Sequence, residues 1–120
     1  MVTDGNGRLL SGETIEDAVR TLEPLDPDAI SINCVPARKL AGDLARLAAA
    51  APGVPLAVYE NLGLPADDRG WAFTDELSPS AYAGLARSWL ALGARIVGGC
   101  CGTTPAHTAA LRYVMSIASP

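Results

Sequence analysis

Hydrophobic positions along this chain follow two spacings, one typical of amphipathic helices and one typical of short buried strands. Apolar residues that recur three or four positions apart predict four helices, which cover residues 14–22, 37–50, 79–92 and 105–117. Short apolar runs between these helices predict three strands, which cover residues 29–34, 56–59 and 95–99. The segment 60–77 has neither spacing, so we expect a long irregular loop there, and long loops are often functional.

Residues at the ends of the predicted helices have the chemistry of caps and stops. Thr14 precedes the first helix with Asp17 three positions on, and Ser78 precedes the third helix with a proline next in the chain. Thr104 and Pro105 open the last helix in the same way. Proline and glycine follow the second helix, and a glycine follows the third. These signals support the helix boundaries independently of the hydrophobic spacing.

The order of the predicted elements is a helix followed by three strand–helix units. Repeated units of this kind form a parallel sheet with right-handed crossovers, and ligands bind at the carboxyl ends of the strands in such folds. A few parallel strands alone form a poor independent fold, because both faces of the sheet need cover and its edges need protection. We therefore expect an α/β fold that is part of a larger barrel, and the abrupt start over residues 1–7 resembles a strand cut near its end.

Composition and charge narrow the class of protein. The chain has 120 residues, 49% of them hydrophobic and 18% charged, which fits one folded domain and excludes a disordered chain. A net charge of -4 without a basic cluster makes nucleic acid and anionic membranes poor partners. No stretch is long and apolar enough to span a bilayer, and the first residues lack the regions of a signal peptide, so we expect a cytoplasmic protein.

Three cysteines, Cys34, Cys100 and Cys101, stand at the carboxyl ends of the first and third predicted strands. An odd number excludes a full disulfide framework, and small buried hydrophobes are the alternative interpretation. The glycines around the adjacent pair favour a site instead, because glycine lets the backbone approach a ligand closely. Two strand ends that meet in space would collect three thiolates around one metal ion and leave a fourth position open, as in catalytic zinc sites.

Three segments carry a specific resemblance to a known family. Residues 30–34 (ISINC), 59–63 (YENLG) and 93–107 (GARIVGGCCGTTPAH) strongly resemble the homocysteine S-methyltransferase family. The resemblance covers essentially the whole chain and implies part of a (β/α)8 TIM barrel, from the end of strand five through helix eight. By this resemblance, residues 1–120 are the carboxyl-terminal part of a homocysteine-binding domain whose first half is absent.

The resemblance also implies the site and its cofactor. Cys34, Cys100 and Cys101 would be the ligands of a zinc ion, Zn2+, and no catalytic residue is implied beyond this metal site. Asn61 matches a family asparagine that approaches the metal or the substrate, so it is predicted to bind substrate. Glu60 stands where the family usually has proline, so we expect a different local turn there. The implied partners are homocysteine and a small-molecule methyl donor, whose identity the sequence leaves open.

The expected reaction is zinc-dependent methyl transfer to the thiol of homocysteine, which gives methionine. A free thiol with a pKa of about 8.5 is mostly protonated at neutral pH, whereas methyl transfer to sulfur needs the thiolate, and zinc binding removes that proton. Three thiolates and Zn2+ carry a formal charge of about -1, so the site keeps electron density on the bound sulfur. Such a site favours thiol alkylation over hydrolysis.

Two other hypotheses remain open at the level of sequence. In the first, the chain is a non-catalytic truncated piece, or one part of a split barrel that needs a partner chain to complete it. In the second, the glycine run after the last strand binds phosphate, as loops near the end of such barrels do. The scarcity of basic residues near that run disfavours the phosphate hypothesis.

Several other residues have a simple structural interpretation. His107, in the first turn of the last helix, is expected to be a surface or capping residue rather than a ligand. Trp89 lies on an apolar helix stripe and is expected in the core, whereas Trp71 and Phe73 are expected to pack within the long loop. The same loop is expected to expose a solvated acidic segment, made of Asp67, Asp68, Asp75 and Glu76.

Overall fold

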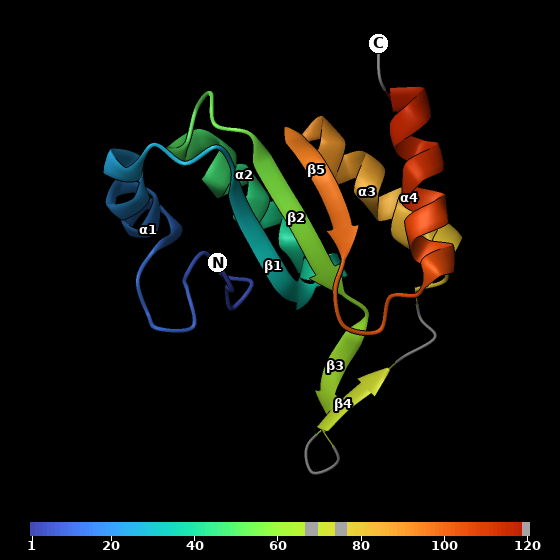
Figure 1. Ribbon diagram of the computed structural model, residues 1–120. Coiled ribbons are helices and arrows are strands. Elements are labelled where there is room, and N and C mark those ends of the chain that lie inside the picture. Colours follow the sequence, from blue (N-terminus) through green and yellow to red (C-terminus); the bar gives the residue numbers. More distant parts are fainter. Residues whose placement is uncertain (67–69, 74–76, 119–120) are drawn as a thin grey trace.

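Three parallel strands and four α-helices form the frame of the described part of the protein, with a small antiparallel hairpin beside it (Figure 1). The structure is a computed structural model, and it describes residues 1–66, 70–73 and 77–118. The helices are α1 (Ile15–Leu22), α2 (Leu40–Ala50), α3 (Pro79–Ala91) and α4 (Pro105–Ala118), with short 3-10 helices η1 (Glu23–Leu25) and η2 (Ala37–Lys39). The strands are β1 (Ile30–Pro36), β2 (Leu56–Asn61), β3 (Gly63–Ala66), β4 (Gly70–Phe73) and β5 (Ala94–Gly99).

The main sheet has the strand order β1-β2-β5, and both pairs of neighbouring strands are parallel. Val58 in the central strand lies beside Ile32 of β1 and Val97 of β5. Since all three strands run the same way, their carboxyl ends meet at one edge, where Figure 1 shows the hairpin of β3 and β4 leaving the sheet. The predicted α/β pattern of parallel strands alternating with helices is therefore confirmed.

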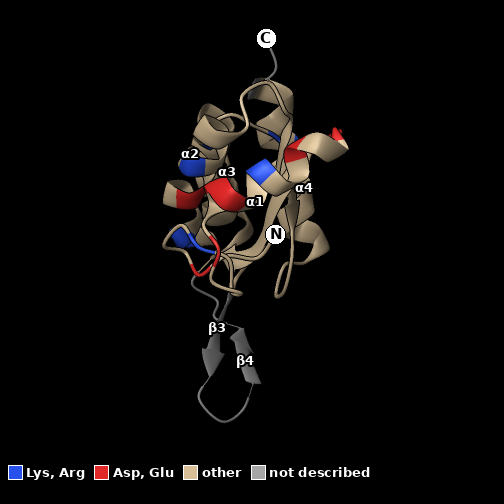
Figure 2. Ribbon diagram, turned by 90° about the vertical axis from the view of Figure 1, so that its left-hand side faces the viewer, with Lys and Arg blue, Asp and Glu red and all other residues tan. Residues whose placement is uncertain are grey.

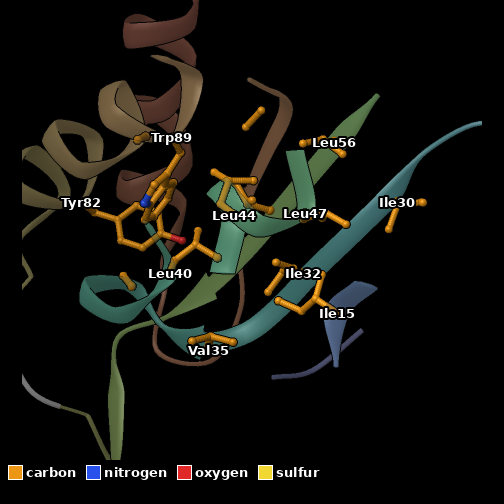
Figure 3. Packing of buried hydrophobic residues seen from close by; sticks show 14 of the residues in the cluster. Ile15, Ile30, Ile32, Val35, Leu40, Leu44, Leu47, Leu56, Tyr82 and Trp89 are labelled. Carbon is orange, nitrogen blue, oxygen red and sulfur yellow. The ribbon is translucent and has the colours of Figure 1, made fainter. Parts of the chain in front are cut away.

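The apolar core lies between one face of this sheet and the helices (Figure 3). Ile32 of β1 and Leu44 and Leu47 of α2 are fully buried in it. Burial of each such side chain contributes about 1.5–3 kcal/mol relative to exposure in water. In α3, Tyr82 and Trp89 meet edge to face with ring centroids 5.4 Å apart, and the expected core position of Trp89 is confirmed.

The opposite face of the sheet is less well covered. Strand alternation turns Tyr59 of β2 and Ile96 of β5 away from the helices, and their side chains are 36% and 41% exposed. Val58, the neighbour of Tyr59 on the helix side, is fully buried. The described residues thus form an open sheet with one covered face, as the prediction of a partial barrel requires.

Side-chain caps form at the predicted starts of α1 and α3. Thr14 Oγ1 accepts a hydrogen bond from the Asp17 N–H at 3.1 Å. Ser78 Oγ accepts one from the Ala81 N–H at 3.2 Å. These bonds satisfy backbone donors that the first turn of a helix leaves without a partner, so local sequence sets both helix starts.

His107 caps the start of α4 from inside the fold. Its Nδ1 accepts from the Thr104 N–H at 3.2 Å, and its Nε2 lies 3.0 Å from the Leu77 carbonyl oxygen. Because Nδ1 accepts, Nε2 carries the proton and donates to Leu77. The capping prediction is confirmed, whereas the surface alternative is wrong, since His107 is buried.

The expected long loop contains regular structure that hydrophobic spacing did not indicate. β2 runs on to Asn61, and β3 and β4 pair in antiparallel register from Gly63 opposite Phe73 to Ala66 opposite Gly70. β3 (GLPA) contains glycine and proline, which disfavour strands, so its pairing with β4 decides its conformation. The prediction of an irregular segment is therefore wrong for both strands. Outside the described residues and side chains lie the expectations for Asp67, Asp68, Asp75, Glu76, Trp71 and Phe73.

Charged residues of both signs lie close together on the side of the molecule seen in Figure 2. Arg46 of α2 forms an ion pair with Glu16 of α1 at 3.0 Å, and Arg20 pairs with Asp17 within α1. Exposed pairs of this kind contribute at most about 1 kcal/mol each, so the core dominates the stability. In the part of the chain that the structure describes, no helix is long and apolar enough to cross a membrane.

Candidate metal centre

Three cysteine sulfurs meet at the carboxyl edge of the sheet. Cys34 Sγ lies 3.1 Å from Cys100 Sγ and 3.8 Å from Cys101 Sγ, and the sulfurs of the adjacent pair are 3.8 Å apart. All three side chains are partly buried. The parallel topology thus brings together the three residues that the sequence indicated as metal ligands, although they come from strands that are not neighbours.

Cys34 lies inside β1 rather than at its end, because the strand continues to Pro36. The prediction that Cys34 ends its strand is therefore wrong. The register with β2 shifts at this point, so Cys34 occupies a bulge, and its φ of +64° lies in the left-handed region. Two side chains of β2 hold the bulge: Asn61 Nδ2 donates to the Cys34 carbonyl oxygen at 2.7 Å, and Glu60 Oε2 accepts from the Val35 N–H at 2.9 Å.

Cys100 and Cys101 follow β5 directly, as predicted, in a turn built on glycines. A Cβ atom on Gly99 would lie 2.3 Å from Thr103 Oγ1, so glycine alone leaves room for that side chain. Thr103 Oγ1 in turn donates to the Cys100 carbonyl oxygen at 2.7 Å. Gly102 has a φ of +85°, a conformation that favours glycine. Residues close in sequence therefore shape most of this turn.

The end of β2 joins the two cysteine-bearing segments. The Glu60 carbonyl oxygen accepts from the Cys100 N–H at 2.9 Å, and the Leu62 N–H donates to the Cys101 carbonyl oxygen at 2.9 Å. The hydroxyl of Tyr82, which comes from α3, donates to the same Glu60 carbonyl oxygen at 3.0 Å. The relative position of the three sulfurs therefore depends on β2, which itself carries no cysteine.

Crowding of the thiols lowers the acidity of Cys34. The pKa of Cys34 is raised to about 12, chiefly by its hydrogen bond with Cys100, then by burial and by its hydrogen bond with Cys101. Cys34 is therefore protonated at neutral pH in the metal-free protein. A metal ion that binds all three sulfurs must displace this proton, so metal binding releases protons.

Glu60 and Asn61 are polar residues of β2 with a relative exposure of 0%. Within the described residues, Glu60 Oε1 and Asn61 Oδ1 have no hydrogen-bond partner. Burial raises the pKa of Glu60 to about 8; the Val35 N–H opposes this shift, and nearby Asp43 adds to it. A carboxyl group with this pKa is mostly protonated at neutral pH, unlike an exposed glutamate.

No sequence motif indicated Glu60 as part of the site. The available signal was an acid in a strand whose first three residues are apolar, since a buried acid needs hydrogen-bond partners. Asn61 lies at the site as predicted, and its amide nitrogen donates a hydrogen bond to the Cys34 carbonyl oxygen. Its role in binding substrate stays a prediction.

The fold and the site together define the class of protein: an open parallel α/β sheet with three thiols near its carboxyl edge, which form a candidate metal centre. The chain belongs to the homocysteine S-methyltransferase family, whose model matches residues 1–115. The family expected from the three sequence segments is therefore confirmed.

Individual relatives agree with this membership. The chain is 33% identical over 107 residues to methionine synthase from Mycobacterium tuberculosis, which covers 89% of this chain and 9% of that protein. It is 30% identical over 110 residues to homocysteine S-methyltransferase 1 from Zea mays, which covers 89% of this chain and 34% of that protein. It therefore spans about a third or less of the length of these relatives.

A solved structure supports the fold. The homocysteine methyltransferase MmuM from Escherichia coli, in an oxidized form, matches with a TM-score of 0.73 and 31% sequence identity. The match covers 93% of this chain and 33% of the other. The open sheet and this match confirm the predicted fold, an α/β arrangement that forms part of a (β/α)8 barrel.

Proposed function

We propose that this protein takes part in zinc-dependent methyl transfer to the thiol of homocysteine, which gives methionine. The observation that carries the proposal is the convergence of three cysteine sulfurs, all within 4.8 Å of one another, in a chain of this family. The names of the relatives support the chemistry, since one is a homocysteine S-methyltransferase and another a methionine synthase.

The three thiols fit a zinc ion. A tetrahedral site with zinc–sulfur bonds of about 2.3 Å places its sulfurs roughly 3.8 Å apart. Two of the three separations are 3.8 Å, and the third, 3.1 Å, belongs to the hydrogen-bonded pair Cys34 and Cys100. Soft thiolate ligands favour zinc over harder metals. Cys34, Cys100 and Cys101 are therefore the proposed ligands, and three ligands leave one position open.

A bound zinc ion would supply one effect, the removal of the proton from a thiol that enters the open position. The cysteines would hold that thiolate in an anionic environment that keeps it nucleophilic. Asn61 is proposed to bind substrate, because its Oδ1 is buried beside the cysteine segments and is free to accept a hydrogen bond within the described residues. No catalytic residue is proposed beyond the metal site.

Residues 1–120 are proposed to be the carboxyl-terminal part of a homocysteine-binding domain, and to supply its metal centre. A second hypothesis is a non-catalytic piece, or one part of a split barrel that requires a partner chain. The open face of the sheet favours the need for further cover, because Tyr59 and Ile96 are exposed on it.

Zinc content tests the ligands. Cys34→Ser, Cys100→Ser and Cys101→Ser are each expected to weaken zinc binding by at least about 10-fold, since each removes one thiolate. The exposed Ser88→Ala variant of α3 is the control and should bind zinc as the wild type does. Stoichiometric zinc, measured by mass spectrometry, that persists when Cys100 and Cys101 are both replaced would contradict the assignment.

Size-exclusion chromatography combined with a methyltransferase assay separates the two functional hypotheses. Turnover of homocysteine by a folded monomer would contradict the split-barrel hypothesis. Activity that appears only when a second chain co-elutes would support it. Zinc binding without activity under either condition would favour the non-catalytic piece.

A further inference from the structure

The end of β2 carries a buried carboxyl group for which the proposed reaction has no use. Glu60 has 0% exposure, and strand alternation places it on the same side as the buried Val58, facing the helices. Its Oε1 has no hydrogen-bond partner within the described residues. Burying an incompletely hydrogen-bonded carboxyl group destabilises a fold relative to an apolar side chain of similar size. A specific contact must therefore account for an acid at this position.

Glu60 contacts both cysteine-bearing segments, the Cys34 bulge and the turn of Cys100 and Cys101. Glu60 Oε2 accepts from the N–H of Val35, the residue that follows Cys34 in the bulge. The carbonyl oxygen of the same glutamate accepts from the Cys100 N–H. One residue thus bonds to both segments, with its side chain on one and its backbone on the other.

The conformation of Cys34 makes the side-chain contact important. A residue with a φ of +64° that is not glycine needs support from its surroundings, and here the support comes from Glu60 and Asn61. Asn61 bonds to the carbonyl group of Cys34, whereas Glu60 bonds to the next N–H. Together the two side chains fix the peptide unit between Cys34 and Val35, and hence the direction of the Cys34 side chain.

We propose that Glu60 is a positioning residue that sets the distance of Cys34 Sγ from the sulfurs of Cys100 and Cys101. The inference rests on the proposed function for the identity of the metal, but the positioning itself concerns the sulfurs alone. Residues around a ligand commonly change metal affinity by about 10- to 100-fold when they are replaced.

The chain offers matched variants. Glu60→Gln keeps an oxygen that accepts from the Val35 N–H, whereas Glu60→Leu removes that acceptor at similar volume. Asp43→Asn is the control for a general loss of stability. Asp43 is also a buried acid, and it accepts from the Gly7 N–H at 2.7 Å and from the Thr3 hydroxyl, without contact to a cysteine.

An arsenical tests the positions of the sulfurs without zinc. Phenylarsine oxide condenses with two neighbouring thiols, forming two arsenic–sulfur bonds and releasing one water molecule. In the metal-free, reduced protein we expect Glu60→Gln to bind it within about threefold of the wild type, and Glu60→Leu to bind it at least about 10-fold more weakly. Asp43→Asn should lower the melting temperature but leave the arsenical affinity unchanged.

Zinc affinity, measured by competition with a chromophoric chelator, should follow the same order among the variants. The spectrum of the Co2+-substituted protein should shift in Glu60→Leu, because thiolate-to-metal bands respond to the ligand geometry. A merely structural role would lower the melting temperature of Glu60→Leu without changing this spectrum.

Two results would overturn the inference: capture of the arsenical by Glu60→Leu as tightly as by the wild type, or an equal loss of affinity in Asp43→Asn. If Glu60→Leu does not fold, Glu60→Asp replaces it, because a carboxyl group one methylene shorter must pull Val35 out of place. Arsenical binding by Glu60→Asp as in the wild type would then overturn the inference. A wild type that captures the arsenical but binds no zinc would contradict the proposed function alone.

Discussion

The two cysteine-bearing segments reach the same point of the molecule by different means. The turn that holds Cys100 and Cys101 is shaped by its neighbours in sequence, since Gly99 makes room for Thr103 and Thr103 bonds back to Cys100. The Cys34 bulge has no such local device. It is held by side chains of β2: Glu60, 25 residues beyond Val35, and Asn61, 27 residues beyond Cys34.

The two segments should therefore respond differently to substitution. A turn built on glycine and local hydrogen bonds tolerates little substitution within itself, but it depends little on distant residues. A bulge held by distant side chains changes geometry when those side chains change. Substitutions in β2 should therefore act mainly on Cys34, and substitutions around Gly99 mainly on Cys100 and Cys101.

Raising the pH is expected to have the largest effect, a loss of stability of the fold, because it ionises the buried Glu60 beside the Cys34 bulge. The pKa of Glu60 is about 8 in the fold, against an ordinary value of 4.5, so between these values the folded protein keeps a proton that the unfolded chain has released. The contribution of Glu60 to the free energy of unfolding is therefore complete below pH 4.5. It falls as the pH rises to about 8, on the order of a few kcal/mol.

Chemical denaturation of the metal-free protein at a series of pH values measures this effect. Glu60→Gln carries no titratable group at this position, so its stability curve should be flatter than that of the wild type between pH 4.5 and about 8. Identical pH dependence in the two proteins would show that Glu60 does not carry the effect.

Gly99→Ala should disrupt the other segment. The added Cβ would lie 2.3 Å from Thr103 Oγ1 and 2.7 Å from Thr103 Cβ, so the turn must shift. Overpacking of this kind costs about 2–3 kcal/mol, and zinc binding should weaken with it. Thermal denaturation and zinc titration measure both.

Gly84→Ala is the matched control for that change. A Cβ on Gly84, in the middle of α3, meets nothing within 4 Å. This variant should gain about 0.5–1 kcal/mol, because alanine favours a helix over glycine. A loss of zinc in both glycine variants would contradict the steric explanation for Gly99.

Of the two cysteine-bearing segments, Asn61→Leu should affect only the Cys34 bulge. It removes the donor to the Cys34 carbonyl group at similar volume, and the loss of a buried hydrogen bond of this kind costs about 1–2 kcal/mol. We expect weaker arsenical and zinc binding through a displaced Cys34. Alkylation kinetics that change for Cys100 and Cys101 but not for Cys34 would contradict this expectation.

Tyr82→Phe should have the smallest effect, about 1 kcal/mol. It removes a hydroxyl that lies 3.0 Å from the carbonyl oxygens of both Glu60 and Gly98 and shares its single proton between them, which links β2 to β5. Tyr113→Phe, at a position that is 65% exposed, is the control and should leave the melting temperature unchanged. Equal effects of the two substitutions would show that the buried hydroxyl contributes nothing specific.

Much of the fold could be predicted because its signals are local. Thr14 and Ser78 are both caps in the structure, and Trp89 is in the core, since capping and helical spacing involve residues within a turn or two of one another. The convergence of the cysteines was predictable as well. It follows from a general property of parallel sheets, whose strand ends share one edge.

The features that the sequence did not reveal all depend on distant partners. The hairpin of β3 and β4 exists through the pairing of two short strands. His107 can be buried because the carbonyl oxygen of Leu77, 30 residues away, accepts a hydrogen bond from its Nε2–H. Glu60 of β2 is part of the site because its side chain accepts a hydrogen bond from Val35 of the neighbouring strand β1. None of these contacts leaves a periodic or compositional trace in the chain.

The family, the alternation of strands and helices, and the three thiols that a metal would need can all be identified from the sequence. Each depends on residue type and spacing, which are visible without any tertiary contact. The left-handed conformation of Cys34 and the support of its bulge by Glu60 and Asn61 of β2 are visible only in the folded protein. Hydrogen bonds between such distant residues form only once the parallel sheet has brought its strand ends together.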